Sequence, residues 1–167
     1  LTGALNRRIG DSYVSDIFSL FVRGRADPVL YSLDLDDFKS VNDRWGHEAG
    51  DVVLKAVVER IRQTMRTSDY LFRWGGEEFL LVYNDISRES VRTLAERLNR
   101  VVETMDIPIP SRDGETSIRI TLSIGVSWFD RRDDGAGAAL RRADEALYRA
   151  KAAGKNCARL QDDPAAV

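Results

Sequence analysis

Hydrophobic positions along the chain recur with two different periods, and each change of period marks a boundary between predicted elements. Spacings of three and four predict amphipathic helices over four stretches, residues 6–23, 48–65, 87–105 and 135–153. Alternation predicts strands over three stretches, residues 28–36, 107–110 and 116–128. Two further apolar runs, residues 70–72 and 79–83, flank Gly75-Gly76 and predict a β-hairpin.

The first predicted strand divides its residues between two faces. One face carries Val29, Tyr31, Leu33 and Leu35, and the other carries Leu30, Ser32, Asp34 and Asp36. Asp34 therefore stands near the carboxyl end of the strand, the sheet edge at which α/β proteins bind ligands. Asp36 or Asp37 is expected to cap a short helix through about residue 44. The first backbone N–H groups of that helix, around residues 37–39, would form a phosphate cradle.

Gly75-Gly76 is expected to form the reversal of the hairpin, because a two-residue turn needs the positive φ that glycine adopts at low cost. Glu77 and Glu78 follow directly, and two adjacent carboxylates favour a bound cation, although a solvated hairpin end is the alternative. If Glu77 meets Asp34, the two form an oxygen-only site that suits Mg²⁺ or Mn²⁺ bridging substrate phosphates. Since neighbouring strand residues point to opposite faces, only one of the two glutamates is expected to bind that metal.

The elements follow the order αβααββαββαβ, which predicts an α/β sandwich with helices packed on a mainly antiparallel sheet. Its βαββαβ core indicates a ferredoxin-like fold. A turn at residues 111–114 joins two of the strands. The chain opens on LTGALNRR without a starting methionine, so we expect residues 1–167 to be a single domain of a longer protein with an N-terminal regulatory part.

Composition narrows the possible chemistry. The chain of 167 residues is 43% hydrophobic and 31% charged, as is typical of a soluble globular domain. Its net charge of −2 and lack of a long apolar run give no reason to expect a nucleic acid polymer or membrane contact as partner. A lone Cys157 fits a reducing, cytoplasmic compartment, although a missing N-terminal part could still anchor the full-length protein to a membrane. Because His47 is the single histidine and there is a single cysteine, a His/Cys zinc site is excluded. The groups that remain for catalysis are carboxylates, lysines and a hard metal ion.

Six sequence motifs occur together in one order. They are LTGALNRR at Leu1, DLDDFKSVND from Asp34, GHEAGD from Gly46, RWGGEEF from Arg73, TLSIGVS from Thr121 and ADEALYRAKAAGKN from Ala143. On these motifs nearly the whole chain resembles the GGDEF domain of diguanylate cyclases, in the GGEEF form of the signature. The resemblance implies a nucleotidyl-cyclase-like palm that condenses two GTP into cyclic di-GMP, with release of two pyrophosphates. It also implies a homodimer, because each half-site would hold one GTP.

The resemblance assigns roles to the acidic residues. Asp34, the carbonyl of Leu35 and Glu77 would hold Mg²⁺ or Mn²⁺. Glu77 would also help to deprotonate the attacking 3′-hydroxyl, with Glu78 beside it in the catalytic signature.

Substrate contacts are implied for a wider set, namely Phe38, Lys39, Asn42, His47, Asp51, Gly75, Gly76, Lys151 and Lys155. Asn42 and Asp51 would read guanine, since a carboxylate accepts from N1–H and the N2 amine while an amide donates to O6. Phe38 and Lys39 would bind phosphates, chiefly through backbone N–H groups. Lys151 and Lys155 would add positive charge from the last helix, where a four-residue spacing places both amines on one face.

These assignments have structural alternatives. Asp36-Asp37 could be a cap and its solvated neighbour, and the two lysines could favour the C-terminal dipole of the helix. Asn42 could be an ordinary surface residue, and His47 could pack beside Trp45 rather than act as a base. Lys155 also stands where the family often has arginine, which keeps a phosphate contact possible but loses the bidentate geometry.

A further pattern, Arg66-Thr67-Ser68-Asp69, precedes the signature at the distance of the family's RxxD motif. The resemblance implies an inhibitory site for cyclic di-GMP on the face away from the active site, with Arg97 as a second arm. The alternative is a surface Arg–Asp pair at a helix end.

Three functions compete on these grounds. An active, metal-dependent cyclase under product feedback is favoured over a catalytically silent GTP or cyclic di-GMP sensor, because the signature acids are retained. A purely structural interaction domain has no use for Asp34, Glu77 and Asp51 together.

Overall fold

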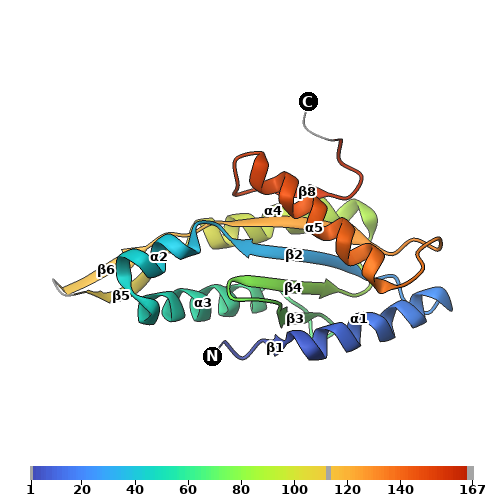
Figure 1. Cartoon of the computed structure of the whole chain (residues 1–167), viewed down its shortest axis with the longest axis horizontal. Helices are drawn as coiled ribbons and strands as arrows, with labels where there is room; N and C mark the ends of the chain where they lie inside the picture. Colours follow the sequence, from blue (N-terminus) through green and yellow to red (C-terminus); the bar gives the residue numbers. More distant parts are fainter. Residues whose placement is uncertain (1, 112–113, 165–167) are drawn as a thin grey trace.

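The computed structural model describes residues 2–111 and 114–164, and its centre is a six-stranded sheet with helices on both faces (Figure 1). The strands of this sheet are β1 (Leu5–Asn6), β2 (Val29–Leu35), β3 (Tyr70–Arg73), β4 (Glu78–Tyr83), β7 (Leu122–Trp128) and β8 (Ala158–Leu160). The helices are α1 (Arg7–Val22), α2 (Phe38–Trp45), α3 (His47–Arg62), α4 (Arg88–Glu103) and α5 (Ala136–Ala152). A separate two-stranded sheet pairs β5 (Ile107–Ser111) with β6 (Gly114–Ile118).

The main sheet has the strand order β1-β3-β4-β2-β7-β8. The four inner strands pair antiparallel, whereas β1 and β8 join the two edges in parallel. From β2 to β7 the chain passes through α3, β3, β4 and α4, which is the predicted βαββαβ core. The predicted α/β sandwich with a mainly antiparallel, ferredoxin-like sheet is therefore confirmed.

Strand β2 is buried at every position and separates two hydrophobic layers. Its odd-numbered residues pack with α3 and α4, and the hydroxyl of Tyr31 donates to the carbonyl of Val91 on α4 at 2.9 Å. Leu30 faces the other layer, which contains Val14 of α1 and Ala139 of α5. The alternation predicted for this strand is confirmed, and helices on both faces account for its complete burial.

The strand predicted over residues 116–128 is instead two strands with different partners. Ile118 on β6 pairs with Ile107 of the small hairpin, whereas Leu122 on β7 pairs with Leu35 of the main sheet. At Thr121, between them, the carbonyl accepts from the backbone N–H of Asp36 at 2.9 Å. The β5–β6 hairpin consequently extends from one end of the molecule, beyond α2 (Figure 1). The predicted turn at residues 111–114 lies partly at 112–113, outside the described residues.

Helix ends depend on local hydrogen bonds. The side chain of Asn6 caps α1 by accepting from the N–H of Ile9 at 3.0 Å. Helix α3 ends at Arg62 rather than at residue 65, and Ser87 takes the N-cap position of α4 without a side-chain capping bond. Within the described ranges, no helix has the length and apolar character needed to cross a membrane.

Candidate active site

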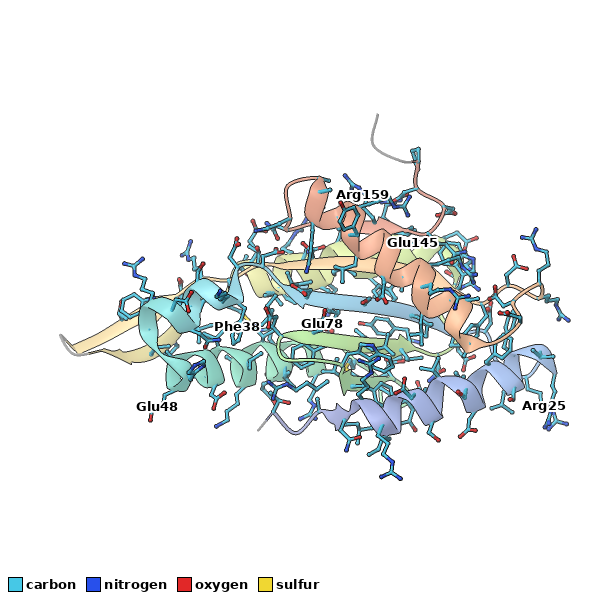
Figure 2. All side chains as sticks on the ribbon, in the orientation of Figure 1. Arg25, Phe38, Glu48, Glu78, Glu145 and Arg159 are labelled. Carbon is cyan, nitrogen blue, oxygen red and sulfur yellow. The ribbon has the colours of Figure 1, made fainter. Side chains whose placement is uncertain are left out.

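The two acidic stretches predicted to form a site meet at the carboxyl end of β2. The β2–β4 register places Asp34 opposite Glu78, so these two side chains lie on the same face of the sheet. The backbone N–H of Leu35 donates to the carbonyl of Glu77 at 3.3 Å, which brings Glu77 directly beside the end of β2. Asp34 is buried, Glu77 is half-buried and Glu78 is exposed. Figure 2 shows Glu78 at the start of β4 and Phe38 at the start of α2.

The signature hairpin is confirmed, but its reversal differs from the predicted two-residue glycine turn. The loop spans residues 74–77, and the N–H groups of Trp74 and Gly75 both donate to the carbonyl of Glu78, at 2.8 and 3.2 Å. Neither Gly75 nor Gly76 has a positive φ. A Cβ on Gly75 would lie 2.5 Å from the carboxylate oxygen Oε2 of Glu78, which is the end of an exposed side chain that can move aside.

Arg73 holds this loop from the end of β3, a role that the sequence did not indicate. Its guanidinium Nε donates to the carbonyls of Gly75 and Gly76 at 3.2 and 3.1 Å, and its Nη2 donates to Gly76 at 2.7 Å. Because the loop lies outside a regular strand, these bonds supply the constraint that a β-ladder would otherwise give. Glu77, at the end of the loop, is thereby kept beside Leu35.

Two lysines lie at the same edge. The Nζ of Lys151 is 2.8 Å from a carboxylate oxygen of Asp34, and the Nζ of Lys155 is 2.6 Å from Asp37. The hydrogen bond that Lys155 donates to Asp37 raises the pKa of Lys155. The prediction that both lysines lie on one helical face is wrong, because α5 ends at Ala152 and Lys155 has a left-handed φ of 66°. The turn after the helix, rather than the helix, places Lys155.

The predicted cap of α2 is also wrong. Asp37 takes the N-cap position but has φ 55° and ψ 25°, and its side chain makes no capping hydrogen bond. A capping side chain normally reaches the N–H groups of the first turn from an extended backbone, which the left-handed conformation prevents. The first N–H groups of a helix have no intrahelical partner, and here no cap side chain accepts from them. This favours a phosphate cradle at Phe38, which is buried, and at the exposed Lys39.

Asp36 is neither a cap nor a solvated neighbour. Its buried carboxylate accepts from the hydroxyls of Thr121 and Ser123, both at 2.7 Å, and from the backbone N–H of Asn156 at 3.0 Å. Asp36 also borders a hollow of about 470 Å³ that lies between α2 and the β5–β6 hairpin. It therefore joins the end of β2 to β7 and to the segment after α5.

The two candidate guanine-binding residues lie close together at the joint between α2 and α3. Gly46 forms this joint with φ 84°, and its N–H donates to the carbonyl of Asn42 at 2.9 Å. The half-buried side chain of Asn42 lies over Gly50, since a Cβ there would be 2.0 Å from Asn42 Oδ1. Gly50 directly precedes Asp51, which is half-buried. The structure therefore brings the side chain of Asn42 against the residue that precedes Asp51.

His47 takes the first position of α3 and is exposed. The side chain stacked on Trp45 is the guanidinium of Arg44, 4.8 Å from the ring centroid.

At the predicted product site, the contacts of Asp69 differ from those expected for a product-binding residue and from those expected for a surface Arg–Asp pair. Asp69 is buried, and its two carboxylate oxygens accept from the backbone N–H groups of Arg66, at 2.7 Å, and Asn84, at 3.2 Å. Across the described residues, no ion pair joins the side chains of Arg66 and Asp69, so the surface-pair alternative is wrong. Arg66 and Arg97 are both exposed. Burial raises the pKa of Tyr83, and the positive charges of Arg97 and Arg66 oppose that rise.

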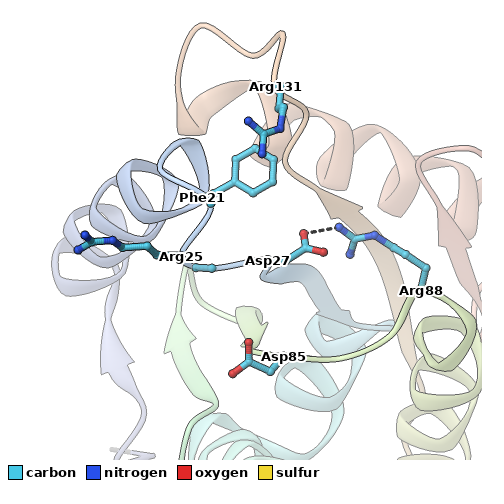
Figure 3. Close-up of a pocket in the computed structure, with 8 residues that line it drawn as sticks. Phe21, Arg25, Asp27, Asp85, Arg88 and Arg131 are labelled. Atoms are coloured by element: carbon cyan, nitrogen blue, oxygen red, sulfur yellow. Dashed lines mark hydrogen bonds and ion pairs between the residues drawn. The ribbon is translucent and has the colours of Figure 1, made fainter.

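A second hollow, of about 580 Å³, lies at the opposite end of β2 and contains none of the predicted site residues (Figure 3). Its lining includes Phe21, Arg25, Asp27, Asp85, Arg88 and Arg131. Arg88 pairs with Asp27 at 2.5 Å and stacks on Trp128, 4.9 Å from the ring centroid. This hollow is separate from the acidic edge.

The donor set at the acidic edge suits a hard divalent cation. Among the described residues, no three His, Cys, Asp or Glu side chains converge as a complete metal cage. Mg²⁺ commonly takes one or two protein carboxylates and completes its coordination with water and substrate phosphates. The carboxylates of Asp34 and Glu77 with the carbonyl of Leu35 fit that requirement, since the Leu35–Glu77 hydrogen bond keeps the three residues adjacent.

Comparison with known proteins agrees with this arrangement. The family described as "Diguanylate cyclase, GGDEF domain" matches residues 1–157. Diguanylate cyclase A of Treponema denticola is 40% identical over 127 residues, covering 76% of this chain and 33% of the relative. The response regulator PleD of Caulobacter vibrioides is 37% identical over 157 residues, covering 93% of this chain and 34% of the relative. The chain thus spans about a third of the length of these relatives.

Solved structures show the same fold. The GGDEF domain of DgcB from Caulobacter crescentus, in complex with c-di-GMP, superposes with a TM-score of 0.89 at 28% identity, covering 97% of this chain and 94% of that chain. The active GGEEF domain of a diguanylate cyclase from Vibrio cholerae gives a TM-score of 0.84 at 29% identity, with coverages of 96% and 99%. By motif content, fold and family match, the chain belongs to the GGDEF domain family of diguanylate cyclases.

Proposed function

We propose that this domain catalyses the condensation of two GTP into cyclic di-GMP with release of two pyrophosphates. The observation that carries the proposal is that the two acidic stretches meet at one sheet edge. There the backbone N–H of Leu35 donates a hydrogen bond to the carbonyl of Glu77, and the carboxylate of Asp34 forms an ion pair with Lys151. Carboxylates, ammonium groups and helix N–H donors at one sheet edge are the groups needed to bind a nucleoside triphosphate. The similarity to named diguanylate cyclases supports the same reaction.

In this proposal Asp34, the carbonyl of Leu35 and Glu77 hold Mg²⁺ or Mn²⁺, which when bound offsets negative charge on the reacting phosphates. The N–H groups of Phe38 and Lys39 bind phosphate oxygens at the uncapped start of α2. Lys151 and Lys155 already place two ammonium groups beside this edge and contact the triphosphate there.

Glu77 accepts the proton of the 3′-hydroxyl, since it is the half-buried acid of the pair and lies beside Leu35. Glu78, exposed and opposite Asp34, adds negative charge on the same face. Asp51 accepts from N1–H and N2–H of guanine, and the amide of Asn42 donates to O6. Adenine lacks this donor pair, so the two residues select GTP.

Each domain in this scheme holds one GTP, so catalysis needs two protomers with their acidic edges facing each other. Product feedback is part of the proposal, with the exposed Arg66 and Arg97 as the cationic contacts. Asp69 then acts by fixing the backbone of Arg66 rather than by pairing with its side chain. Complexes of related GGDEF domains with c-di-GMP support product binding.

The test is incubation of the purified domain with GTP and Mg²⁺, with pyrophosphate and cyclic di-GMP quantified over a range of enzyme concentrations. We expect the rate to rise faster than linearly with enzyme concentration, because the active species is a dimer. Glu77→Gln keeps the volume of the side chain but removes its charge and should lower turnover by roughly 10³-fold or more. Glu59→Gln, an exposed position on α3, is the matched control. A Glu77→Gln variant that retains a tenth of the activity would overturn these roles, and GTP binding without turnover would favour the sensor.

A further inference from the structure

Asp36 is a buried carboxylate whose hydrogen bonds converge from distant parts of the chain. Only 7% of the residue is exposed. Its Oδ1 accepts from Ser123, and its Oδ2 accepts from both Thr121 and the backbone N–H of Asn156. Among the described residues, the hydrogen-bond partners of its carboxylate are two hydroxyls and a backbone amide rather than a cation.

The backbone that Asp36 contacts after α5 is unusual. Lys155 and Asn156 both have left-handed conformations, with φ of 66° and 46°. Two consecutive non-glycine residues in this region are unfavourable and persist only where surrounding contacts fix them. The bond from the Asn156 N–H to Asp36 is one such contact, and the Asn156 side chain donates to Glu103 on α4 at 3.0 Å as another.

This turn determines where the amine of Lys155 lies. Helix α5 ends at Ala152 and Gly154 has φ 109°, so the chain has already left the helix when it reaches Lys155. The left-handed turn returns Lys155 toward β2, where its Nζ lies 2.6 Å from Asp37. Asp36 and Asp37 therefore contact the same turn, one through its backbone and the other through its amine.

We propose that Asp36 is a positioning residue, which fixes the Lys155–Asn156 turn and thereby holds the amine of Lys155 at the phosphate-binding edge. It touches no substrate and acts only through Lys155. The identity of the ligand, the triphosphate of GTP, rests on the proposed cyclase function. The link between Asp36 and the turn does not, because it follows from the hydrogen bonds of the chain itself.

The first measurement is independent of activity. Hydrogen exchange by mass spectrometry over residues 153–158 should be slow in the wild type and faster in Asp36→Ala, because the Asn156 N–H loses its acceptor. Ser127→Ala is the control for general destabilisation, because it removes another buried hydrogen bond, which the Ser127 hydroxyl donates to the carbonyl of Ala139 at 2.7 Å. It should leave exchange in this segment unchanged. Equal exchange in wild type and Asp36→Ala would overturn the proposal whether or not the domain makes cyclic di-GMP.

The second measurement is a double-mutant cycle on the KM for GTP. Asp36→Ala and Lys155→Ala should each raise KM by roughly 10-fold, the effect expected for a lost hydrogen bond to a charged group. Because Asp36 acts through Lys155, adding Asp36→Ala to Lys155→Ala should change KM less than about twofold. The positioning role would be contradicted if the two single-variant increases in KM multiplied in the double variant. It would also be contradicted if Asp36→Ala lost stability with its KM unchanged.

Asp36→Asn provides a second variant if Asp36→Ala does not fold, since it keeps one acceptor oxygen. In that variant KM and exchange over residues 153–158 should rise together. A raised KM with exchange as slow as in the wild type would overturn the proposal. Failure of the wild type to convert GTP would refute the proposed function, and the exchange result would still decide the role of Asp36.

Discussion

Replacing Gly50 by alanine should impair GTP recognition while leaving the fold intact. The added Cβ would lie 2.0 Å from Asn42 Oδ1, 3.0 Å from its Cγ and 3.1 Å from Cζ of Phe38. Its two nearest neighbours belong to the end of one half-buried side chain, which can rotate away, rather than to the backbone. The perturbation therefore moves Asn42 out of the α2–α3 joint.

The expected magnitude follows from the hydrogen bond that Asn42 is proposed to make to guanine. Leaving a polar partner unsatisfied costs about 1–3 kcal/mol, which corresponds to roughly 5- to 150-fold in kcat/KM. Stability should change little, because alanine gains up to ~1 kcal/mol of helix propensity over glycine within α3 and this offsets the repacking. With ~2–4 °C per kcal/mol for a domain of this size, the melting temperature should move by only a few degrees.

The assay compares kcat/KM for GTP and the melting temperature of wild type, Gly50→Ala, Asn42→Ala and the double variant. Gly50→Ala and Asn42→Ala should show similar losses, and the methyl group should add little once Asn42 is alanine. Gly137→Ala is the matched control for helix propensity. The closest atom to its Cβ would be in the Arg141 guanidinium, at 3.4 Å, so the methyl group there displaces no side chain. An unchanged kcat/KM in Gly50→Ala would refute the assignment of Asn42 to guanine.

Three other predictions follow from the packing and the charges. Gly125→Ala should unfold or strongly destabilise the domain, by ~3 kcal/mol or more, because its Cβ would lie 2.0 and 2.2 Å from the backbone atoms Ala143 O and Leu147 N of α5; a melting temperature within a few degrees of wild type would contradict this. The hydrogen bond from Arg142 lowers the pKa of Asp133 below its ordinary 3.8, so the stability it contributes is present above pH 3.8 and is lost as the pH falls through the lower folded pKa. Urea denaturation should give a lower free energy of unfolding for Asp133→Asn than for the wild type at neutral pH, and this difference should shrink below pH 3.8. A difference that stays constant with pH would argue against the linkage. Arg66→Ala should weaken inhibition by added cyclic di-GMP, measured as the ratio of rates with and without product, and equal inhibition would show that Arg66 does not bind product.

The elements with a strong period could be predicted from the sequence because their burial follows that period. Strand β2 is covered on both faces, and the two sets of residues predicted for it do face different layers. The division of residues 116–128 could not be predicted in this way. Apolar residues continue at every second position through Ile118, Ile120, Leu122 and Ile124, although the strand partner changes from β5 to β2. Alternation records which face is buried but contains no information about the pairing strand.

Glycine in the signature illustrates a second limit. The pair Gly75-Gly76 predicts a hairpin correctly, yet the reason assumed from the pattern, a positive φ, does not apply to either residue. A Cβ on Gly75 would instead meet the carboxylate oxygen of Glu78 at 2.5 Å, a contact that the exposed Glu78 side chain can relieve by moving. A sequence pattern can therefore locate a turn without giving the backbone conformation of its glycines.

The placement of Lys155 shows how two sound local predictions can conflict. A four-residue spacing from Lys151 predicts a shared helical face, whereas Gly154 predicts that the helix ends between them. In the structure the helix ends before Lys155, as Gly154 predicts, since Gly154 and Lys155 have φ of 109° and 66°. Positive charge at the acidic edge consequently comes from two backbone elements, Lys151 from the last turn of α5 and Lys155 from the turn braced by Asp36. Because the two lysines depend on different contacts, a change in the turn can alter the proposed contact of Lys155 with phosphate while Lys151 stays paired with Asp34.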